Sequence, residues 1–233
     1  MSVIRESLGR VADSVYAKVF PTRYKEAHEL SYWNGRVAAE SVLHNEHYQF
    51  FYTGFFGLDP SFYQGRKILD IGCGPRGSLE WATEASERVG LDPLATEYLK
   101  MGASRHQMRY VDAPSEHIPF PDGHFDVVCS FNSLDHVGDL DLTTAEIKRV
   151  LKPSGLFLLI TEINHPATAC EPIVIKDVAS VFADAFEIES LRTYEIGDQH
   201  DIYGQLRMNA RFDEDDATDR PAIVAAKLVK RPG

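Results

Sequence analysis

Short apolar runs alternate with polar stretches of helical spacing along most of the chain, which predicts an α/β fold. Residues 125–131 are nearly all apolar, as expected of a central parallel strand that is covered on both faces. The other predicted strands are 68–71, 87–93, 108–112, 155–162, 186–196 and 222–230. Helices are predicted for 78–86, 94–101, 143–152 and 172–182, the third of which stops at Pro153 and Gly155.

The first 57 residues are helical and aromatic in pattern, with Val11, Val15 and Val19 at fourfold spacing. Either these helices cover one edge of the sheet, or they form a lid that closes over a ligand and excludes water. Tyr32 and Trp33 are the lid candidates. We expect residues 1–60 to form an N-terminal helical extension and 61–233 the core of a single domain. His44 and His47, near Glu40, indicate a solvated helix face rather than a metal site.

Composition narrows the class of partner. Lys and Arg number 24 against 35 Asp and Glu, and the net charge of −11 disfavours nucleic acid as a substrate. No run of eighteen apolar residues occurs and the first residues lack the apolar core of a signal peptide, so we expect no membrane association. The three cysteines show no paired spacing, which indicates a reduced, cytoplasmic protein.

A glycine-rich turn follows the first strand. Gly72, Gly74 and Gly77 permit a tight turn and let backbone N–H groups approach a ligand, and Ser78 suits the N-cap of the predicted helix. The pattern also fits a nicotinamide-dinucleotide site. Asp70, however, would repel a pyrophosphate and favours a cationic or amine-bearing ligand. Asp92 falls 20 residues after Gly72, where a βαβ unit places a carboxylate for ribose hydroxyls.

The stretch Ile-Leu-Asp-Ile-Gly-Cys-Gly resembles the first motif of the class I S-adenosylmethionine-dependent methyltransferases. The later Ile-Pro-Phe-Pro-Asp-Gly and Arg-Val-Leu-Lys-Pro-Ser-Gly extend the resemblance over roughly 65–162. It implies a doubly wound, mostly parallel seven-stranded sheet with the last strand antiparallel, and S-adenosylmethionine as cofactor. The residues implied to bind it are Asp70, Gly72, Cys73, Gly74, Asp92, Pro93, Ser115, Glu116 and Asn132.

The adenine contact stays open between two acids. Asp112 and Glu116 are both candidates for the adenine amino group, and the backbone N–H of Ser115 is the candidate for a ring nitrogen. Both acids lie in the stretch that links the third and fourth predicted strands.

Candidate catalytic residues follow the fourth and fifth predicted strands, whose carboxyl ends are where open α/β sheets bind ligands. His136 is the candidate base because histidine titrates near neutrality, and Asp135 or Glu162 could orient it. Alternatively His136 only packs or caps its loop, and His165 is the second candidate. Trp33, His136, Glu162 and His165 are the candidates for the acceptor pocket.

We expect methyl transfer to a small neutral or cationic molecule, with oxygen favoured over nitrogen. The residues Phe131-Asn-Ser-Leu134 replace the Asn/Asp-Pro-Pro-aromatic sequence that amine methylation of adenine or glutamine would use. Two other classes are considered. A non-catalytic module that only binds the cofactor would need no open acceptor pocket, and a nicotinamide-dependent reductase would lack Asp70 and the Ile-Pro-Phe-Pro-Asp-Gly segment.

Overall fold

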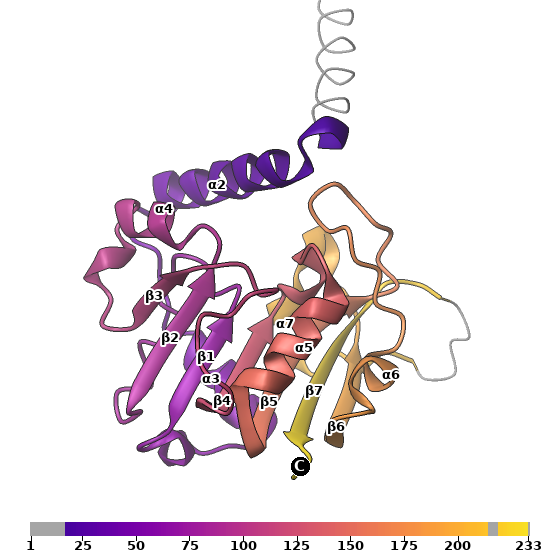
Figure 1. The fold of residues 1–233 in the computed structure, drawn as a ribbon. Helices are drawn as coiled ribbons and strands as arrows, with labels where there is room; N and C mark the ends of the chain where they lie inside the picture. The colour runs from indigo at the N-terminus through magenta and orange to yellow at the C-terminus, as the bar shows by residue number, and fades with distance from the viewer. Residues whose placement is uncertain (1–16, 214–218, 233) are drawn as a thin grey trace, which may run out of the picture.

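The computed structural model describes residues 17–213 and 219–232. Seven strands form one sheet in the order β3-β2-β1-β4-β5-β7-β6 (Figure 1). All seven predicted strands are present, and the fourth and seventh have the predicted bounds. The strands are β1 Lys67–Ile71, β2 Glu87–Asp92, β3 Arg109–Asp112, β4 Phe125–Phe131, β5 Leu151–Ile163, β6 Phe186–Tyr194 and β7 Ala222–Lys230.

Strand direction confirms the predicted sheet. Strands β1 to β5 pair in parallel, whereas β7 lies between β5 and β6 and is antiparallel to both. Because β1 to β5 run the same way, their carboxyl ends meet at one edge of the sheet, where open α/β folds bind ligands.

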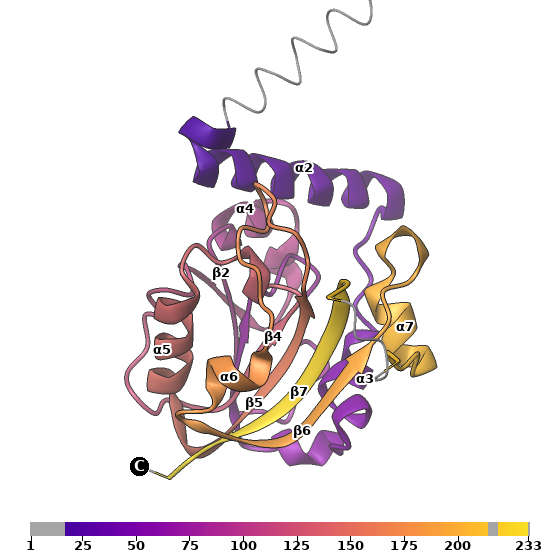
Figure 2. The ribbon, with the colours of Figure 1, turned by 90° about the vertical axis from the view of Figure 1, so that its right-hand side faces the viewer.

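Helices cover both faces of the sheet, so there are two apolar cores. The first core lies under α5 and α6, and the second lies under α3, η1, η2 and α7 (Figure 2). Successive residues of β1 serve opposite cores, Ile68 the second and Leu69 the first, as the strand pleat requires. The bounds are α3 Tyr48–Tyr52, η1 Gly54–Phe56, η2 Pro60–Tyr63, α5 Leu140–Val150, α6 Val178–Phe182 and α7 Ile202–Met208.

Most of the remaining elements lie at the carboxyl edge. Helix α2 (Pro21–Glu40) crosses above this edge, over α4 (Ala95–Lys100) and the loop that follows β5 (Figures 1 and 2). The short 3₁₀ turns η4 Leu134–His136 and η5 Asp198–His200 complete the edge, whereas η3 Ala103–Arg105 precedes β3. None of the described helices is long and apolar enough to cross a bilayer.

The N-terminal expectations are only partly testable, since Val11 and Val15 lie outside the described residues. Val19 is exposed. Helix α2 ends at Glu40, with Ser41 in a left-handed conformation. The interpretation that His44 and His47 share a helix face with Glu40 is therefore wrong.

The predicted helix over 78–86 is also wrong, because the segment between β1 and β2, all of it described, folds as successive turns. Long-range contacts hold it in that form. Leu79 and Ala82 are buried in the second core, and Glu80 Oε1 accepts hydrogen bonds of 2.8 Å from the backbone N–H groups of Gln107 and Met108. Ser78 does not cap a helix but donates its hydroxyl hydrogen to Asp70.

Other boundaries shift for local reasons. Helix α5 starts earlier than predicted because the Asp139 side chain caps it, accepting from the Leu142 N–H at 2.9 Å. Helix α6 is a single short turn behind the Asp177 cap. Strand β5 begins at Leu151, which pairs with Phe125 across an irregularity in the register.

Candidate functional site

Polar residues mark the carboxyl ends of the five parallel strands. Asp70 lies near the end of β1, Asp92 ends β2 and Asp112 ends β3, while Asn132 directly follows β4 and Glu162 lies near the end of β5. Strand register places Asp92 opposite Asp112. The fold thus gathers four carboxylates and one amide along the edge that α2 crosses.

Asp70 is buried, with 2% of its surface exposed. Its Oδ2 accepts a hydrogen bond of 2.9 Å from the Tyr52 hydroxyl and another from the Ser78 hydroxyl. Desolvation disfavours the charged form and raises the pKa of Asp70 to about 7, although both hydrogen bonds oppose the shift. A cationic ligand nearby would restore the ionised form.

The glycine turn is tied to Asp92. The Gly72 N–H donates to the Leu91 carbonyl (2.8 Å), and the Gly74 N–H donates to Asp92 Oδ2 (3.3 Å). The Leu94 N–H donates to Oδ1 at 2.9 Å. Burial raises the pKa of Asp92 to about 6 against these two hydrogen bonds. The carboxylate is therefore held by backbone groups on both oxygens.

Two other predicted residues lie beside this turn. Cys73 is buried under the turn, close to Gly90, where an added Cβ would lie 2.6 Å from the Cys73 sulfur. Pro93 is exposed and follows Asp92.

Helix α2 contacts the glycine turn at two points. The Trp33 ring lies over Gly74, where an added Cβ would be 3.1 Å from the ring. Arg76, with 8% exposed surface, donates from Nη1 and Nη2 to the two carboxylate oxygens of Glu40, each at 2.7 Å. Its guanidinium lies 5.5 Å from the centre of the Trp33 ring.

The loop between β3 and β4 is fixed by side-chain hydrogen bonds. Glu116 Oε1 accepts from the Gly138 and Asp139 N–H groups at 2.6 and 3.0 Å, and the Ser115 hydroxyl lies 2.9 Å from that of Thr143. Among the described residues, Asp112 accepts one hydrogen bond, from the Thr96 N–H at 3.3 Å. Glu116 therefore joins two loops, whereas Asp112 retains acceptor capacity at the sheet edge.

Beyond β4 the structure brings His136 and His165 to a shared carboxylate. His136 Nε2 is 3.9 Å from Glu171 Oε1 and 4.0 Å from Asp135 Oδ1, and His165 Nδ1 is 3.8 Å from Glu171 Oε2. The Asp135 backbone carbonyl accepts a hydrogen bond of 3.2 Å from the Ile173 N–H. This bond joins η4, which carries His136, to the loop after β5 that carries His165 and Glu171.

Glu162 binds a third histidine, His200, beside His136 and His165. Its Oε1 is hydrogen-bonded to His200 Nε2 at 2.6 Å, and only 3% of the residue is exposed. The His165 and His200 rings meet edge to face with centroids 6.4 Å apart. Burial raises the pKa of Glu162, and the like charge of Asp135 raises it further. We call Asp135, His136, Glu162, His165, Glu171 and His200 the histidine–carboxylate cluster.

Of the predicted acceptor residues, His136, Glu162 and His165 belong to this cluster, whereas Trp33 lies over the glycine turn. Sequence reasoning missed Glu171, His200, the Tyr52 contact to Asp70 and the Arg76–Glu40 pair. Glu162 and His200 are 38 residues apart, and Arg76 and Glu40 are 36 apart. No local pattern marks partners at such separations.

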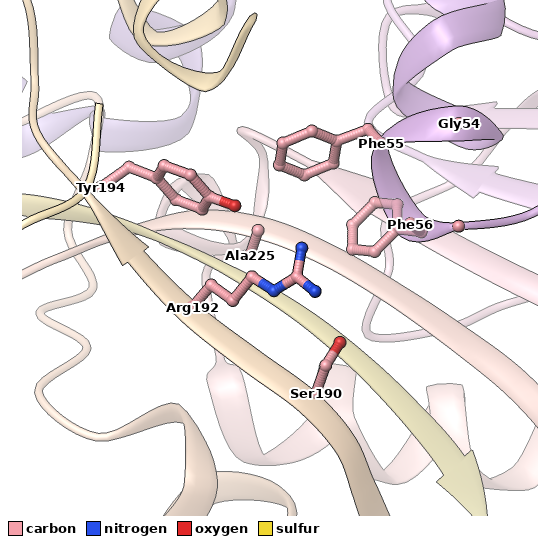
Figure 3. Close-up of a pocket in the computed structure, with 8 residues that line it drawn as sticks. Gly54, Phe55, Phe56, Ser190, Arg192, Tyr194 and Ala225 are labelled. Carbon is pink, nitrogen blue, oxygen red and sulfur yellow. The ribbon is translucent and has the colours of Figure 1, made fainter. Parts of the chain in front are cut away.

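A cavity of about 180 Å³ lies elsewhere, between η1 and the strands β6 and β7 (Figure 3). Arg192 and Tyr194 extend into it from β6, facing Phe55 and Phe56. None of the predicted site residues lines this cavity. Its Phe56 wall stacks on Phe131, with ring centroids 5.9 Å apart, so the cavity lies behind the end of β4.

Comparison with known proteins supports the resemblance seen in the motifs. The family model described as a methyltransferase domain matches residues 69–159. The chain is 30% identical over 180 residues to the ubiquinone/menaquinone biosynthesis C-methyltransferase UbiE of Idiomarina loihiensis, a match that covers 72% of this chain and 68% of the relative. The chain belongs to the class I S-adenosylmethionine-dependent methyltransferases. The cofactor of this methyltransferase is accordingly S-adenosylmethionine.

Other matches are shorter or show the fold alone. The sterol 24-C-methyltransferase of Aspergillus fumigatus is 29% identical over 138 residues, which is 56% of this chain but only 35% of the relative. The chain thus corresponds to about a third of that enzyme's length. The crystal structure of an S-adenosylmethionine-dependent methyltransferase from Mesorhizobium loti aligns with a TM-score of 0.54 at 19% identity, covering 76% of this methyltransferase and 100% of the other chain.

Proposed function

We propose that this methyltransferase transfers a methyl group to a hydroxyl oxygen of a small molecule held between the histidine–carboxylate cluster and the glycine turn. The observation that carries the proposal is the placement of three histidines around Asp135 and Glu162, at the strand ends next to Asp70 and Asp92. A hydroxyl must lose its proton to attack, and this cluster supplies groups able to take one.

The residues at the carboxyl edge suit the cofactor. Asp92 offers carboxylate oxygens to ribose hydroxyls. The buried Oδ1 of Asn132 has no hydrogen-bond partner in the part of the chain that the structure describes, so it can accept from an ammonium group. The close approach of Trp33 to Gly74 leaves no room for a side chain there. We assign Gly72, Cys73, Gly74 and Pro93 to the same cofactor-binding site, with Asp70 behind it. We call this site the cofactor cradle.

On the adenine side we favour Asp112 over Glu116, since both hydrogen bonds at Glu116 Oε1 serve the protein's own backbone. The Ser115 N–H is assigned to a ring nitrogen. Bound S-adenosylmethionine supplies an electrophilic methyl group on sulfur. The protein's part is to align the acceptor oxygen with it and to exclude water, which contributes on the order of 7–11 kcal/mol in well-oriented systems.

His136 is proposed as the base. Its Nε2 would accept the proton of the acceptor hydroxyl, while the cofactor would supply the methyl group and leave as S-adenosylhomocysteine. Asp135 and Glu171, on either side of Nε2 at 4.0 and 3.9 Å, stabilise the imidazolium that results.

Carbon methylation is the second candidate, because both relatives matched by sequence above are named as C-methyltransferases. A phenolate or enolate can react at oxygen or carbon, so both outcomes use the same base. Methyl-labelled S-adenosylmethionine, incubated with sets of phenols, alcohols and amines, tests the proposal through release of S-adenosylhomocysteine. Nuclear magnetic resonance of the product then distinguishes oxygen, carbon and nitrogen. Cofactor binding without transfer to any set would favour a non-catalytic module.

Replacing His136 by asparagine should lower turnover by roughly 10²–10⁴-fold, the contribution typical of a positioned base. Cofactor affinity should stay within about twofold, since His136 only flanks the cradle. Single-turnover kinetics and calorimetry measure the two quantities. His124→Asn, at the amino edge of the sheet, is the matched control. If the His136 variant keeps wild-type turnover while His165→Asn loses turnover, the base is His165 instead.

We further propose that, within the N-terminal extension 1–60, helix α2 acts as a lid on the core formed by 61–233. Glu40→Gln weakens the pair with Arg76 that fastens α2 to the glycine turn. The interaction between α2 and the glycine turn should lose about 1 kcal/mol, so S-adenosylhomocysteine should dissociate roughly threefold to tenfold faster. Trp33 fluorescence in a Trp81→Phe background follows the rate by stopped flow. Asp184→Asn, which weakens an exposed ion pair with Lys148 on α5, is the control, and an equal effect there would contradict the lid.

A further inference from the structure

The carboxyl ends of β4 and β5 hold an excess of unsatisfied acceptors. Four buried side-chain polar atoms of the described residues lack a hydrogen-bond partner, and three of them are the oxygens Asn132 Oδ1, Asp135 Oδ1 and Glu162 Oε2. Asp135 and Glu162 are 2% and 3% exposed. Buried acceptors without donors cost free energy, so this edge is complementary to a ligand that donates hydrogen bonds.

The three oxygens belong to different parts of the site. Asn132 comes next to Ser133, whose side chain lies against Gly72, so we assign the Asn132 amide to the cofactor cradle. Asp135 and Glu162 act on each other electrostatically and both belong to the histidine–carboxylate cluster. The acceptor must therefore satisfy Asp135 and Glu162.

The charges around these two acids favour a cation. The groups that act most strongly on them are Glu171 and the three histidines of the cluster, with no Lys or Arg among them. Burial lowers the pKa of the partly buried Lys25 on α2, and the acids that oppose this shift most are Glu116 and Glu29 rather than Asp135 or Glu162. Asp135, Glu162 and Glu171 thus lie together, and the three histidines are the groups that chiefly oppose their negative charge. A neutral diol could donate hydrogen bonds, but only a cation also offsets the charge.

We propose that the acceptor is an amine-bearing small molecule whose ammonium group binds between Asp135 and Glu162 while a hydroxyl on the same molecule faces His136. This inference rests on the proposed function and names its substrate class. An ammonium group brings three donors and one positive charge, which matches both unsatisfied oxygens. No group of three His, Cys, Asp or Glu in the described part of the chain is arranged to hold a metal ion.

The geometry around each acid is already fixed. Glu162 lies on β5, paired with Ile223 of β7, and His200 holds its Oε1, so Oε2 remains for a ligand. Asp135 lies on η4, and its backbone carbonyl is tied to Ile173. The backbone around both acids is thus held in place, which favours binding through preorganisation.

Calorimetry on the full chain saturated with S-adenosylhomocysteine tests the inference with two matched series of probes. The aromatic series is tyramine, 4-ethylphenol and 4-hydroxyphenylacetate, and the aliphatic series is 5-aminopentanol, 1-pentanol and 5-hydroxypentanoate. We expect the amine of at least one series to bind tenfold or more tightly than its neutral analogue, and both carboxylates to bind more weakly still. If neither amine is preferred over its neutral analogue, the inference is overturned.

Isosteric variants connect the preference to the two acids. Glu162→Gln and Asp135→Asn should each reduce the amine preference tenfold or more, while Glu189→Gln on β6 should leave it unchanged. Binding of S-adenosylhomocysteine shows that each variant is folded. A preference that survives in both folded variants rejects the site. If S-adenosylhomocysteine fails to bind the wild-type protein, the proposed function falls instead.

Discussion

Asp92→Ala should bind S-adenosylmethionine roughly 10- to 150-fold more weakly than the wild type, a loss of about 1.5–3 kcal/mol. The carboxylate is already oriented by the Gly74 and Leu94 N–H groups, so it meets ribose hydroxyls without rearrangement. Hydrogen bonds to a charged and buried acceptor are stronger than neutral ones. Calorimetry at pH 7.5, above the raised pKa of Asp92, measures the loss with the acid ionised.

Two further variants make the Asp92 result specific. Asp184→Ala removes an exposed acid that pairs with Lys148 and should leave cofactor affinity unchanged. Asp112→Ala, opposite Asp92 in the strand register, should lose less affinity, because an adenine contact through one amino group is a single hydrogen bond. Unchanged affinity in Asp92→Ala would remove the ribose assignment.

The strands were predictable because their signal is local. Residues 125–131 are buried at all but one position and 222–230 at six of nine, and apolar residues dominate both runs. The segment 78–86 has good helix formers, yet it forms turns. Its Glu80 is used by backbone N–H groups 27 and 28 residues away, and Leu79 and Ala82 are buried in the core, so tertiary contacts override helix propensity.

The site divides in the same way. Asp70, Asp92 and Asn132 could be placed because each follows or ends a strand, and parallel strands bring their ends together. His200 could not be placed, since it reaches Glu162 through η5, a turn in which Gln199 and His200 have positive φ. The Arg76–Glu40 pair depends on how α2 lies over the sheet, which the periodicity of α2 does not determine.

Gly72→Ala should destabilise the protein by about 2–4 kcal/mol, the sum of left-handed backbone strain and overpacking. Gly72 has a φ of 70°, and a Cβ there would press on Ser133, with the Ser133 Oγ 2.7 Å away. Ser133 cannot retreat freely, because its hydroxyl donates to the Ile71 carbonyl at 2.8 Å. For a chain of this size the melting temperature should fall by roughly 4–16 °C.

The control for Gly72→Ala is Gly65→Ala, which has the same φ of 70° but no atom within 4 Å of the added Cβ. It isolates the backbone strain, so its melting temperature should fall by clearly less. Adding Ser133→Gly to Gly72→Ala removes the clash, and the pair should cost about 1–3 kcal/mol less than the sum of the single changes. If the melting temperature falls equally in the Gly65 and Gly72 variants, backbone conformation alone requires glycine at position 72, and the contact between the glycine turn and the end of β4 does not.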